Sequence, residues 1–235
     1  MESIPLLKKK LRTALPGFTL VEMMVVLAII TVITTVAVTG QGAFNRSLVL
    51  TDTAYTIAFS IREAQTYGLS SRAANSLNNA GYGIRFSTVT PKSYILYADT
   101  SPASPGSTQG NFCPGHLQPS SSPDSHPGDC IYDPSANPAE LVRTYTLNRG
   151  FSIYQFCGKE VSAPYATKCS STNFETMHIS FMRPATDATI FGRTTSGVLI
   201  ALTDATIYLR SPDGAAERCV FVSKVGQIGV GACPQ

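Results

Sequence analysis

The sequence predicts an α+β protein in which one long N-terminal helix precedes a domain built only of strands. Three observations predict this class. No proline interrupts residues 18–74, the first part of that stretch is a continuous apolar run, and after residue 79 the pattern becomes an alternation of apolar and polar residues. A long helix followed only by strands is typical of a helix packed across antiparallel sheet.

The apolar run Phe18–Val38 is long enough to span a membrane, which takes about 20 mainly apolar residues. Its only charged residue is Glu22, and a charge at membrane depth costs about 2.5–3.5 kcal/mol, so it indicates a function. Four basic residues precede the run: Lys8, Lys9, Lys10 and Arg12. Positive residues stay on the cytoplasmic side, so we expect the bulk of the chain to be exported.

The second half of the helix is predicted to be amphipathic. From about Arg46 onward, apolar residues recur at steps of three and four: Leu50, Ala54, Ile57, Ile61 and Ala64. Such a stripe packs against a core. Gly40 and Gly42 lie where the character of the helix changes. They indicate either a weak point that bends, because glycine is unfavourable inside a helix, or close packing against another helix.

The remainder, residues 76–235, is predicted to form one β-rich domain. Tyr82, Ile84 and Phe86 alternate with smaller or polar residues. Further strand-like segments are Ser93–Ala98, Leu141–Leu147, Phe151–Phe156, Thr176–Met182, Val198–Leu202, Thr206–Arg210, Cys219–Ser223 and Gln227–Val230. They are rich in β-branched and aromatic residues and are separated by turn residues. A long Ser/Pro-rich loop, residues 99–140, interrupts them, and loops of this length are usually functional or disordered.

Six cysteines lie in the part expected to be exported: Cys113, Cys130, Cys157, Cys169, Cys219 and Cys233. Disulfides are the default state in an oxidising compartment. Six cysteines allow 15 connectivities. Proximity in the sequence favours the pairs Cys113–Cys130, Cys157–Cys169 and Cys219–Cys233.

Two metal sites are alternatives within the long loop. Cys113, His116, His126 and Cys130 have spacing that could hold zinc, but an oxidising compartment favours a disulfide. Asp124, Asp129 and Asp133 could offer oxygens to calcium, but they lack EF-hand spacing and are expected to be solvated. We therefore expect no metal and no cofactor.

No catalytic motif is found in the chain, so we expect that it is not an enzyme. His178 lies in an alternating strand without an acidic partner in sequence and is expected to be structural or on the surface. The formal net charge is +3, and residues 1–17 carry all of it. A near-neutral remainder gives no electrostatic case for binding nucleic acid or lipid headgroups.

The start of the chain resembles the class III signal peptide of type IV pilins and type II secretion pseudopilins. The matching residues are Gly17-Phe18-Thr19-Leu20-Val21-Glu22 and the apolar residues that follow. The resemblance implies that prepilin peptidase removes the leader, residues 1–17, and N-methylates Phe18. Residues 18–43 would form a transmembrane helix that becomes filament core, and residues 44–75 would form its amphipathic continuation.

The resemblance also implies a role for Glu22 in assembly. Cleavage leaves a cationic amine on Phe18 in an apolar layer, and two buried charges are tolerable only when they are paired. In this family the Glu is thought to meet the N-terminal amine of a neighbouring subunit. An ordinary secretory signal is shorter and has a small-residue cut site. An uncleaved signal anchor explains neither Gly17 nor Glu22.

The C-terminal part resembles the GspH/FimT-like minor pilins and pseudopilins. The similar segments are Ile179-Ser180-Phe181, Phe191-Gly192, Ile207-Tyr208-Leu209, Val220-Phe221-Val222-Ser223 and Gly226-Gln227-Ile228. Some family members have a Gly-Arg-rich turn associated with DNA binding. The corresponding turn here, residues 226–229, has no arginine, which argues against DNA uptake.

These patterns predict a minor pilin or pseudopilin that helps to initiate or cap a filament. Its expected partners are prepilin peptidase, other subunits, the inner membrane and the assembly platform. The expected location is the bacterial inner membrane, with a single pass and a periplasmic C-terminal domain, then an extracellular pilus or a periplasmic pseudopilus. One alternative is a pilus-borne module that binds DNA, a surface or an export substrate. Another is a signal-anchored periplasmic protein unrelated to filaments.

Overall fold

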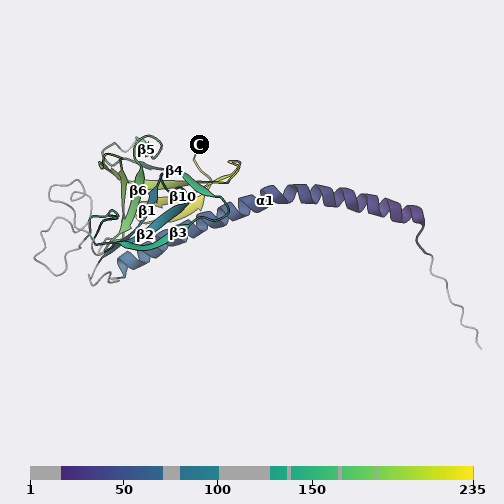
Figure 1. Ribbon diagram of the computed structural model, residues 1–235, viewed down its shortest axis with the longest axis horizontal. Helices are drawn as coiled ribbons and strands as arrows, with labels where there is room; N and C mark the ends of the chain where they lie inside the picture. The colour runs from purple at the N-terminus through teal and green to yellow at the C-terminus, as the bar shows by residue number, and fades with distance from the viewer. Residues whose placement is uncertain are drawn as a thin grey trace, which may run out of the picture. The chain divides into compact units, whose positions relative to one another are not determined.

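The computed structural model confirms the α+β class: an N-terminal helix precedes antiparallel sheet (Figure 1). It describes residues 17–70, 80–100, 128–136, 139–163, 166–183 and 185–234, without the side chains of residues 39–41, 43 and 44. Helix α1 covers Leu20–Leu69. The chain forms two compact units, Met1–Asn45 and Arg46–Gln235, and each is considered by itself.

In the first unit, α1 has the length and composition of a membrane-spanning helix over Leu20–Val38, and none of that span is buried. Thr31, Thr34 and Thr35 each donate their hydroxyl to a carbonyl three or four residues earlier, at 2.7–2.8 Å. Backbone and hydroxyl groups in lipid must find hydrogen-bond partners within the protein. The threonines of this span therefore meet the requirement within the helix itself.

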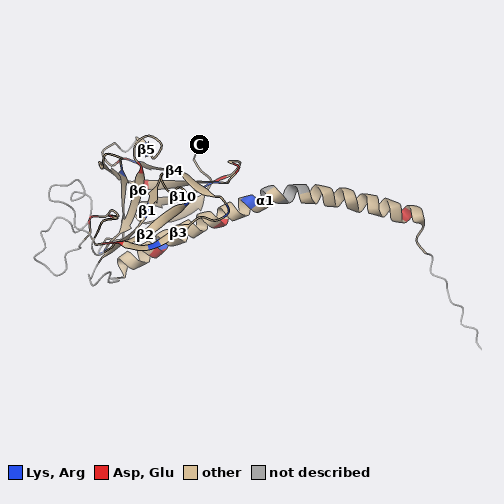
Figure 2. Ribbon diagram, viewed as in Figure 1, with Lys and Arg blue, Asp and Glu red and all other residues tan. Residues whose placement is uncertain are grey.

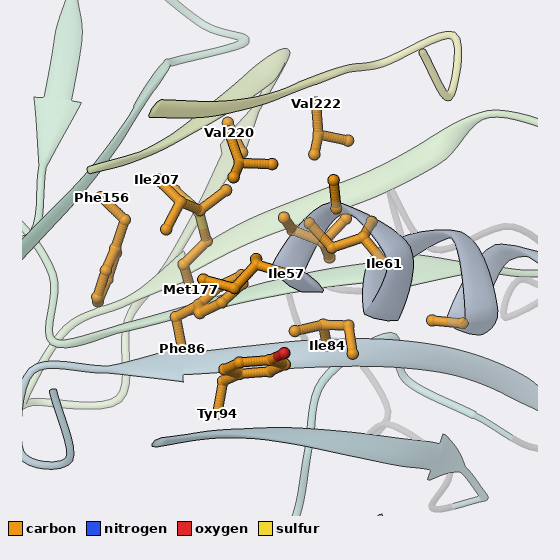
Figure 3. Packing of buried hydrophobic residues seen from close by; sticks show 14 of the residues in the cluster. Ile57, Ile61, Ile84, Phe86, Tyr94, Phe156, Met177, Ile207, Val220 and Val222 are labelled. Carbon is orange, nitrogen blue, oxygen red and sulfur yellow. The ribbon is translucent and has the colours of Figure 1, made fainter. Parts of the chain in front are cut away.

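In the second unit, α1 buries the predicted stripe against the strands. All five stripe residues have no exposed surface: Leu50, Ala54, Ile57, Ile61 and Ala64. Figure 3 shows Ile57 and Ile61 among Ile84, Val220 and Val222, which come from two different sheets. The helix is thus part of the core, as its amphipathic pattern predicts.

The strands form two antiparallel sheets. Sheet 1 contains, in spatial order, β3 (Leu141–Thr146), β2 (Ser93–Asp99), β1 (Gly81–Ser87), β6 (Thr176–Phe181), β7 (Ala188–Arg193) and β8 (Leu199–Leu202). Sheet 2 contains β11 (Ile228–Gly231), β10 (Glu217–Ser223), β9 (Asp204–Arg210), β4 (Ser152–Lys159) and β5 (Thr167–Cys169). Inner side chains of both sheets and of α1 form one core.

Two strands, β5 and β7, were not among the strand-like segments predicted from the sequence. β5 has only three residues, and β7 contains Gly192 opposite Met177 of β6. A Cβ at Gly192 would lie 2.6 Å from the ring of Phe174, so a close approach requires this glycine. Glycine is unfavourable in strands, which hides β7 from a propensity argument.

Polar contacts fix the position of α1 on sheet 1. The Ser60 hydroxyl lies 2.9 Å from the Tyr94 hydroxyl, which is buried. Glu63 accepts hydrogen bonds from Tyr145 of β3 and from Tyr67, the latter at 2.7 Å. The Arg143 guanidinium lies 3.7 Å from the same carboxylate. The helix is thereby held beside β2 and β3.

Two disulfides cross-link sheet 2. Cys157–Cys169 joins β4 to β5, and Cys219–Cys233 joins β10 to the C-terminal segment. Both are the pairs that sequence proximity favours. The third predicted pair involves Cys113, which lies outside the described residues.

The core position of α1 gives a stability prediction. Ile57→Ala should lower the free energy of unfolding by about 2–5 kcal/mol, because it leaves a cavity among side chains with no exposed surface. Phe59→Ala is the matched control, since Phe59 lies on the same helix but is 67% exposed. Urea denaturation measures both variants. A loss at Phe59 as large as the loss at Ile57 would contradict the assignment of the buried face.

Candidate functional site

Residues 17–22 form a capped helix start. Gly17, Phe18 and Thr19 are not helical, and α1 begins at Leu20. The Glu22 N–H donates to Thr19 Oγ1 at 3.2 Å, and the Met23 N–H donates to the Thr19 carbonyl at 3.2 Å. Thr19 is therefore the N-cap residue. The Thr-x-x-Glu spacing is that of a capping box, and the bond that the structure shows within it joins the Thr19 hydroxyl to the backbone N–H of Glu22. Sequence reasoning missed this cap.

Gly17 has no conformational or packing reason to be glycine. A Cβ built on Gly17 meets no atom within 4 Å, and the backbone there does not have the positive φ that favours glycine. Phe18 beside it is 79% exposed. The described chain therefore tolerates a larger side chain at position 17, and any requirement for glycine comes from another molecule.

Glu22 is the acidic residue of the first turn of α1, and its side chain is exposed. Figure 2 shows a single red position near the start of the helix, followed by a long uncharged stretch. The next charged residue in the sequence is Arg46. Within the described residues no ion pair includes Glu22.

A second polar site lies on the outer face of sheet 1, in the segment that precedes β3. Residues 128–132 are buried although they form no helix or strand. We call residues 128–133 the clasp. The five consecutive backbone N–H groups from Asp129 to Asp133 each donate a hydrogen bond to a side chain. Taken in chain order of the donors, the acceptors are Asp99 Oδ1 (2.9 Å), Asp99 Oδ2 (2.7 Å), Asp129 Oδ1 (3.1 Å), His178 Nδ1 (3.0 Å) and Glu140 Oε2 (2.7 Å). This satisfies the requirement that buried backbone donors be paired.

Apolar contacts and close approach complete the clasp. Cys130 and Ile131 pack with Met182 and Phe191 in a small cluster of their own. Cys130 has a φ of 67°, in the left-handed region, and its carbonyl accepts a hydrogen bond from Tyr97 at 3.0 Å. The Cys130 backbone is thus held from both its N–H and its C=O group in a conformation that non-glycine residues rarely adopt.

The fit at the start of the clasp requires a glycine. A Cβ at Gly128 would lie 2.1 Å from the carboxylate carbon of Asp99. No side chain fits in that distance. The carboxylate can therefore reach the N–H groups of Asp129 and Cys130 only because residue 128 has no side chain.

Burial changes the protonation of the groups that hold the clasp. It raises the pKa of Asp99 well above its usual range, and the nearby charges of Asp129 and Glu140 add to the effect. It also raises the pKa of Asp129 to about 7. The pKa of His178 falls to about 3, because burial and then the charges of Arg85 and Arg193 disfavour the imidazolium.

His178 is therefore neutral and acts as an acceptor. Its Nδ1 accepts the Tyr132 N–H, so the proton is on Nε2, which lies 3.1 Å from Thr176 Oγ1 and donates to it. Both ring nitrogens are thus used in holding the fold. The sequence predicts that His178 is structural or on the surface, and its burial favours the first of these.

The described residues contain no group of three His, Cys, Asp or Glu side chains placed to hold a metal ion. Of the zinc alternative, only Cys130 is described. Of the calcium alternative, Asp124 lies outside the described residues. Asp129 and Asp133 each use a carboxylate oxygen to accept a backbone N–H, from Ile131 and Ser135.

Two open grooves flank α1 in the second unit. One, of about 460 Å³, lies between helix residues such as Asp52 and Thr56 and residues 146–149. The other, of about 620 Å³, is lined by Arg62 and Gln65 and by the turn at residues 226–229. The turn has no arginine of its own, but the structure brings Arg62 within 3.4 Å of the Ile228 carbonyl. Sequence reasoning missed this arginine because 166 residues separate the two.

Comparison with known protein families matches the start of the chain. The prokaryotic N-terminal methylation motif matches residues 16–38. This segment contains Gly17, Phe18 and Glu22, together with the apolar span of α1. Neither the search of curated proteins nor the search of solved structures gave a match.

The clasp predicts a pH dependence of stability. An aspartate whose pKa rises from 3.8 to about 7 on folding binds more protons in the folded state between those values. Its contribution to stability is thus full below about pH 4 and is lost as the pH rises to about 7. Asp129→Asn should therefore gain stability relative to wild type across this window, with a slope of at most about 1.4 kcal/mol per pH unit.

Urea denaturation between pH 4 and 8 tests this difference. His178 also titrates differently on folding, but it is present in both proteins and its shift does not depend on Asp129. The substitution does remove one of the charges that raise the pKa of Asp99, so the measured difference belongs to the two carboxyls together. Asp133→Asn is the control, because the pKa of Asp133 is lowered and its contribution changes only below about pH 4. A constant difference between Asp129→Asn and wild type would refute the proposed burial of this carboxyl.

Proposed function

We propose that this chain is a protein of the type IV pilin and pseudopilin family and that it acts as a minor filament subunit. It would help to initiate or cap a type IV pilus or a type II secretion pseudopilus. The observation that carries the proposal is the methylation motif at residues 16–38. Its apolar residues lie on a helix able to cross a membrane. Such a subunit has a structural role rather than an enzymatic one.

Processing after Gly17 is supported by the local geometry. Gly17, Phe18 and Thr19 lie outside the helix and are exposed, so the bond to be cut is accessible. Gly17 has no packing role in the chain itself. A peptidase that reads a small residue at this position accounts for the glycine. Cleavage would leave Phe18 as the new N-terminus, ready for methylation by prepilin peptidase.

Assembly through Glu22 is supported by the lack of an ion pair to it among the described residues. After cleavage, each subunit would carry a cationic amine at Phe18 and a carboxylate at Glu22, both in an apolar layer. Leaving either charge unpaired there is strongly unfavourable. The amine of a neighbouring subunit supplies the partner. The pair would then set the axial register of each incoming subunit.

The proposed location is the inner membrane, with the C-terminal domain in the periplasm before assembly. The two disulfides of sheet 2 support an oxidising compartment. The partners would be prepilin peptidase, other pilin or pseudopilin subunits and the assembly platform. Membership of the GspH/FimT-like branch is part of the proposal and rests on the strand segments of β6, β7, β9 and β10.

A minor position is supported by the insertion between β2 and β3. The clasp packs on Phe191 and Tyr97 of sheet 1, and the sequence between β2 and β3, residues 100–140, is 41 residues long, so this insertion adds bulk to the domain. Repetition of a bulky loop along a filament shaft would crowd neighbouring subunits. A position at the tip, or one of low copy number, avoids that crowding.

Gly17→Leu should block processing, because a peptidase that requires a small residue cannot cut after leucine. The precursor would keep its leader, and immunoblotting would show a single band of higher mass. Gly42→Leu is the matched control, since a Cβ at Gly42 also meets no atom within 4 Å. Normal maturation of Gly17→Leu would refute the cut site.

Glu22→Gln should be processed normally but incorporated into filaments at a level at least about tenfold below wild type. Glutamine retains the capping-box spacing at this position, so the substitution removes the charge and keeps the helix cap. The measurement is the fraction of mature protein in sheared filaments. Asp187→Asn, at an exposed acid outside this helix, is the control. Wild-type incorporation of Glu22→Gln would show that the charge has no role.

A further inference from the structure

Within the described residues the two sheets have four edge strands, and three of them are short or covered. Along β8, the Val161 N–H donates to the Ala201 carbonyl at 2.9 Å, and Glu160 forms a bridge with Leu202. β5 has three residues, and its Cys169 N–H donates to Asn173 Oδ1 at 3.1 Å. β11 has four residues, and Arg62 contacts its Ile228 carbonyl. Proteins protect strand edges in these ways because an open edge recruits other strands.

The fourth edge, β3, is the exception. It has six residues, LVRTYT, and five of them are exposed. Leu141 and Val142 are 48% and 43% exposed. The sequence is rich in β-forming residues and contains no proline. An exposed apolar edge of this length is a predicted site of pairing with another chain.

The alternation of hydrogen bonds between β2 and β3 shows which backbone groups of β3 point away from β2. Ser93 of β2 is opposite Thr146 of β3, so Lys92 and Leu147 form the next opposite pair. The Leu147 N–H donates to the Lys92 carbonyl at 2.8 Å, which makes this a hydrogen-bonded pair. Bonded and non-bonded pairs alternate in an antiparallel ladder. Tyr145 therefore bonds to β2, and Thr144 and Thr146 direct their N–H and C=O groups away from it. No hydrogen bond to these outward groups is formed within the described residues.

Helix α1 lies beside this edge. Asp52 and Thr56 line the groove of about 460 Å³ together with Thr146 and the residues that follow it. Arg143, the only charged residue of β3, lies near Glu63 and over the Tyr145 ring, at 5.6 Å from its centroid. Its guanidinium is thus held toward the helix side and does not close the edge.

We propose that the outer edge of β3 receives an extended strand of a different subunit of the filament, which adds to sheet 1 in antiparallel orientation. This inference rests on the proposed function. A row of unpaired N–H and C=O groups is complementary only to another extended backbone, as in other cases of strand addition. Antiparallel pairing is the slightly more stable of the two orientations.

The direction of α1 argues for a different subunit rather than a second copy. Glu63 lies near Arg143, and Asp52 lines the groove with residues 146–149, so residues 46–69 of α1 run opposite to β3. Two copies paired antiparallel through β3 would reverse these helix segments relative to each other. Their Arg46 ends would point in opposite directions, whereas subunits inserted in one membrane share a direction.

Amide hydrogen exchange tests the proposal on the full chain. In the detergent-solubilised subunit, the Thr144 and Thr146 amides should exchange fast, and the Tyr145 amide should be protected. In filaments sheared from cells, the two threonine amides should become protected by at least about tenfold, because a ladder hydrogen bond slows exchange. Fast exchange of both amides within assembled filaments would overturn the proposal and leave the filament role intact. Failure of the wild-type chain to enter filaments would overturn both.

A pair of variants gives a second test. Thr144→Pro removes an outward N–H, which proline tolerates at a sheet edge, so the domain should keep its urea denaturation midpoint and lose incorporation by at least about tenfold. Thr144→Val keeps the N–H and should incorporate normally. Normal incorporation of a folded Thr144→Pro variant would overturn the proposal. Dimers of solubilised wild type that disappear in Thr144→Pro would identify a second copy as the occupant and overturn the assignment to a different subunit.

Discussion

A single helix in this chain has to satisfy two different surroundings, and the other features follow from that constraint. Over Leu20–Val38 the helix is apolar on all sides and has no buried surface within the chain. From Leu50 onward it buries one stripe completely in a core shared by two sheets. The first half therefore needs lipid or other helices to cover it, and the second half carries the folded domain with it.

The same constraint determines what the charge of Glu22 costs. A carboxylate on the uncovered half is tolerable in water but costly in an apolar layer, unless it meets a positive charge. The cap at Thr19 uses the backbone N–H of Glu22 and not its carboxylate. It does not explain why the residue should carry a charge that no described residue neutralises. The N-terminal amine that the proposed processing would produce is the simplest source of that neutralisation.

The clasp shows how an irregular segment can be buried. A loop placed over a sheet has N–H groups without ladder partners, and an unpaired buried donor costs about 1–3 kcal/mol. Here carboxylates and one imidazole accept five such groups in succession. Clustering of the carboxyls has a consequence, because each one makes ionisation of the next less favourable. The segment is therefore both rigidly held and sensitive to protonation.

Patterns local in sequence were predictable, and contacts between distant residues were not. The 3.6-residue period identified the buried stripe of α1, and alternation located most strands. Periodicity does not specify which strands pair, so the division into two sheets was missed. The clasp depends on Asp99, Glu140 and His178, which lie far apart in sequence and meet only in the fold. The cap at Thr19 could also have been predicted, because its Thr-x-x-Glu spacing is local in the sequence.

Intact mass and N-terminal sequencing of the protein purified from membranes test the central claim most directly. The account predicts a chain that starts at an N-methylated Phe18, with a mass lower by about two protons for each disulfide. An intact leader in cells with an active prepilin peptidase, or a cut at another position, would contradict it. The chain would then be an anchored β-rich domain unrelated to filaments.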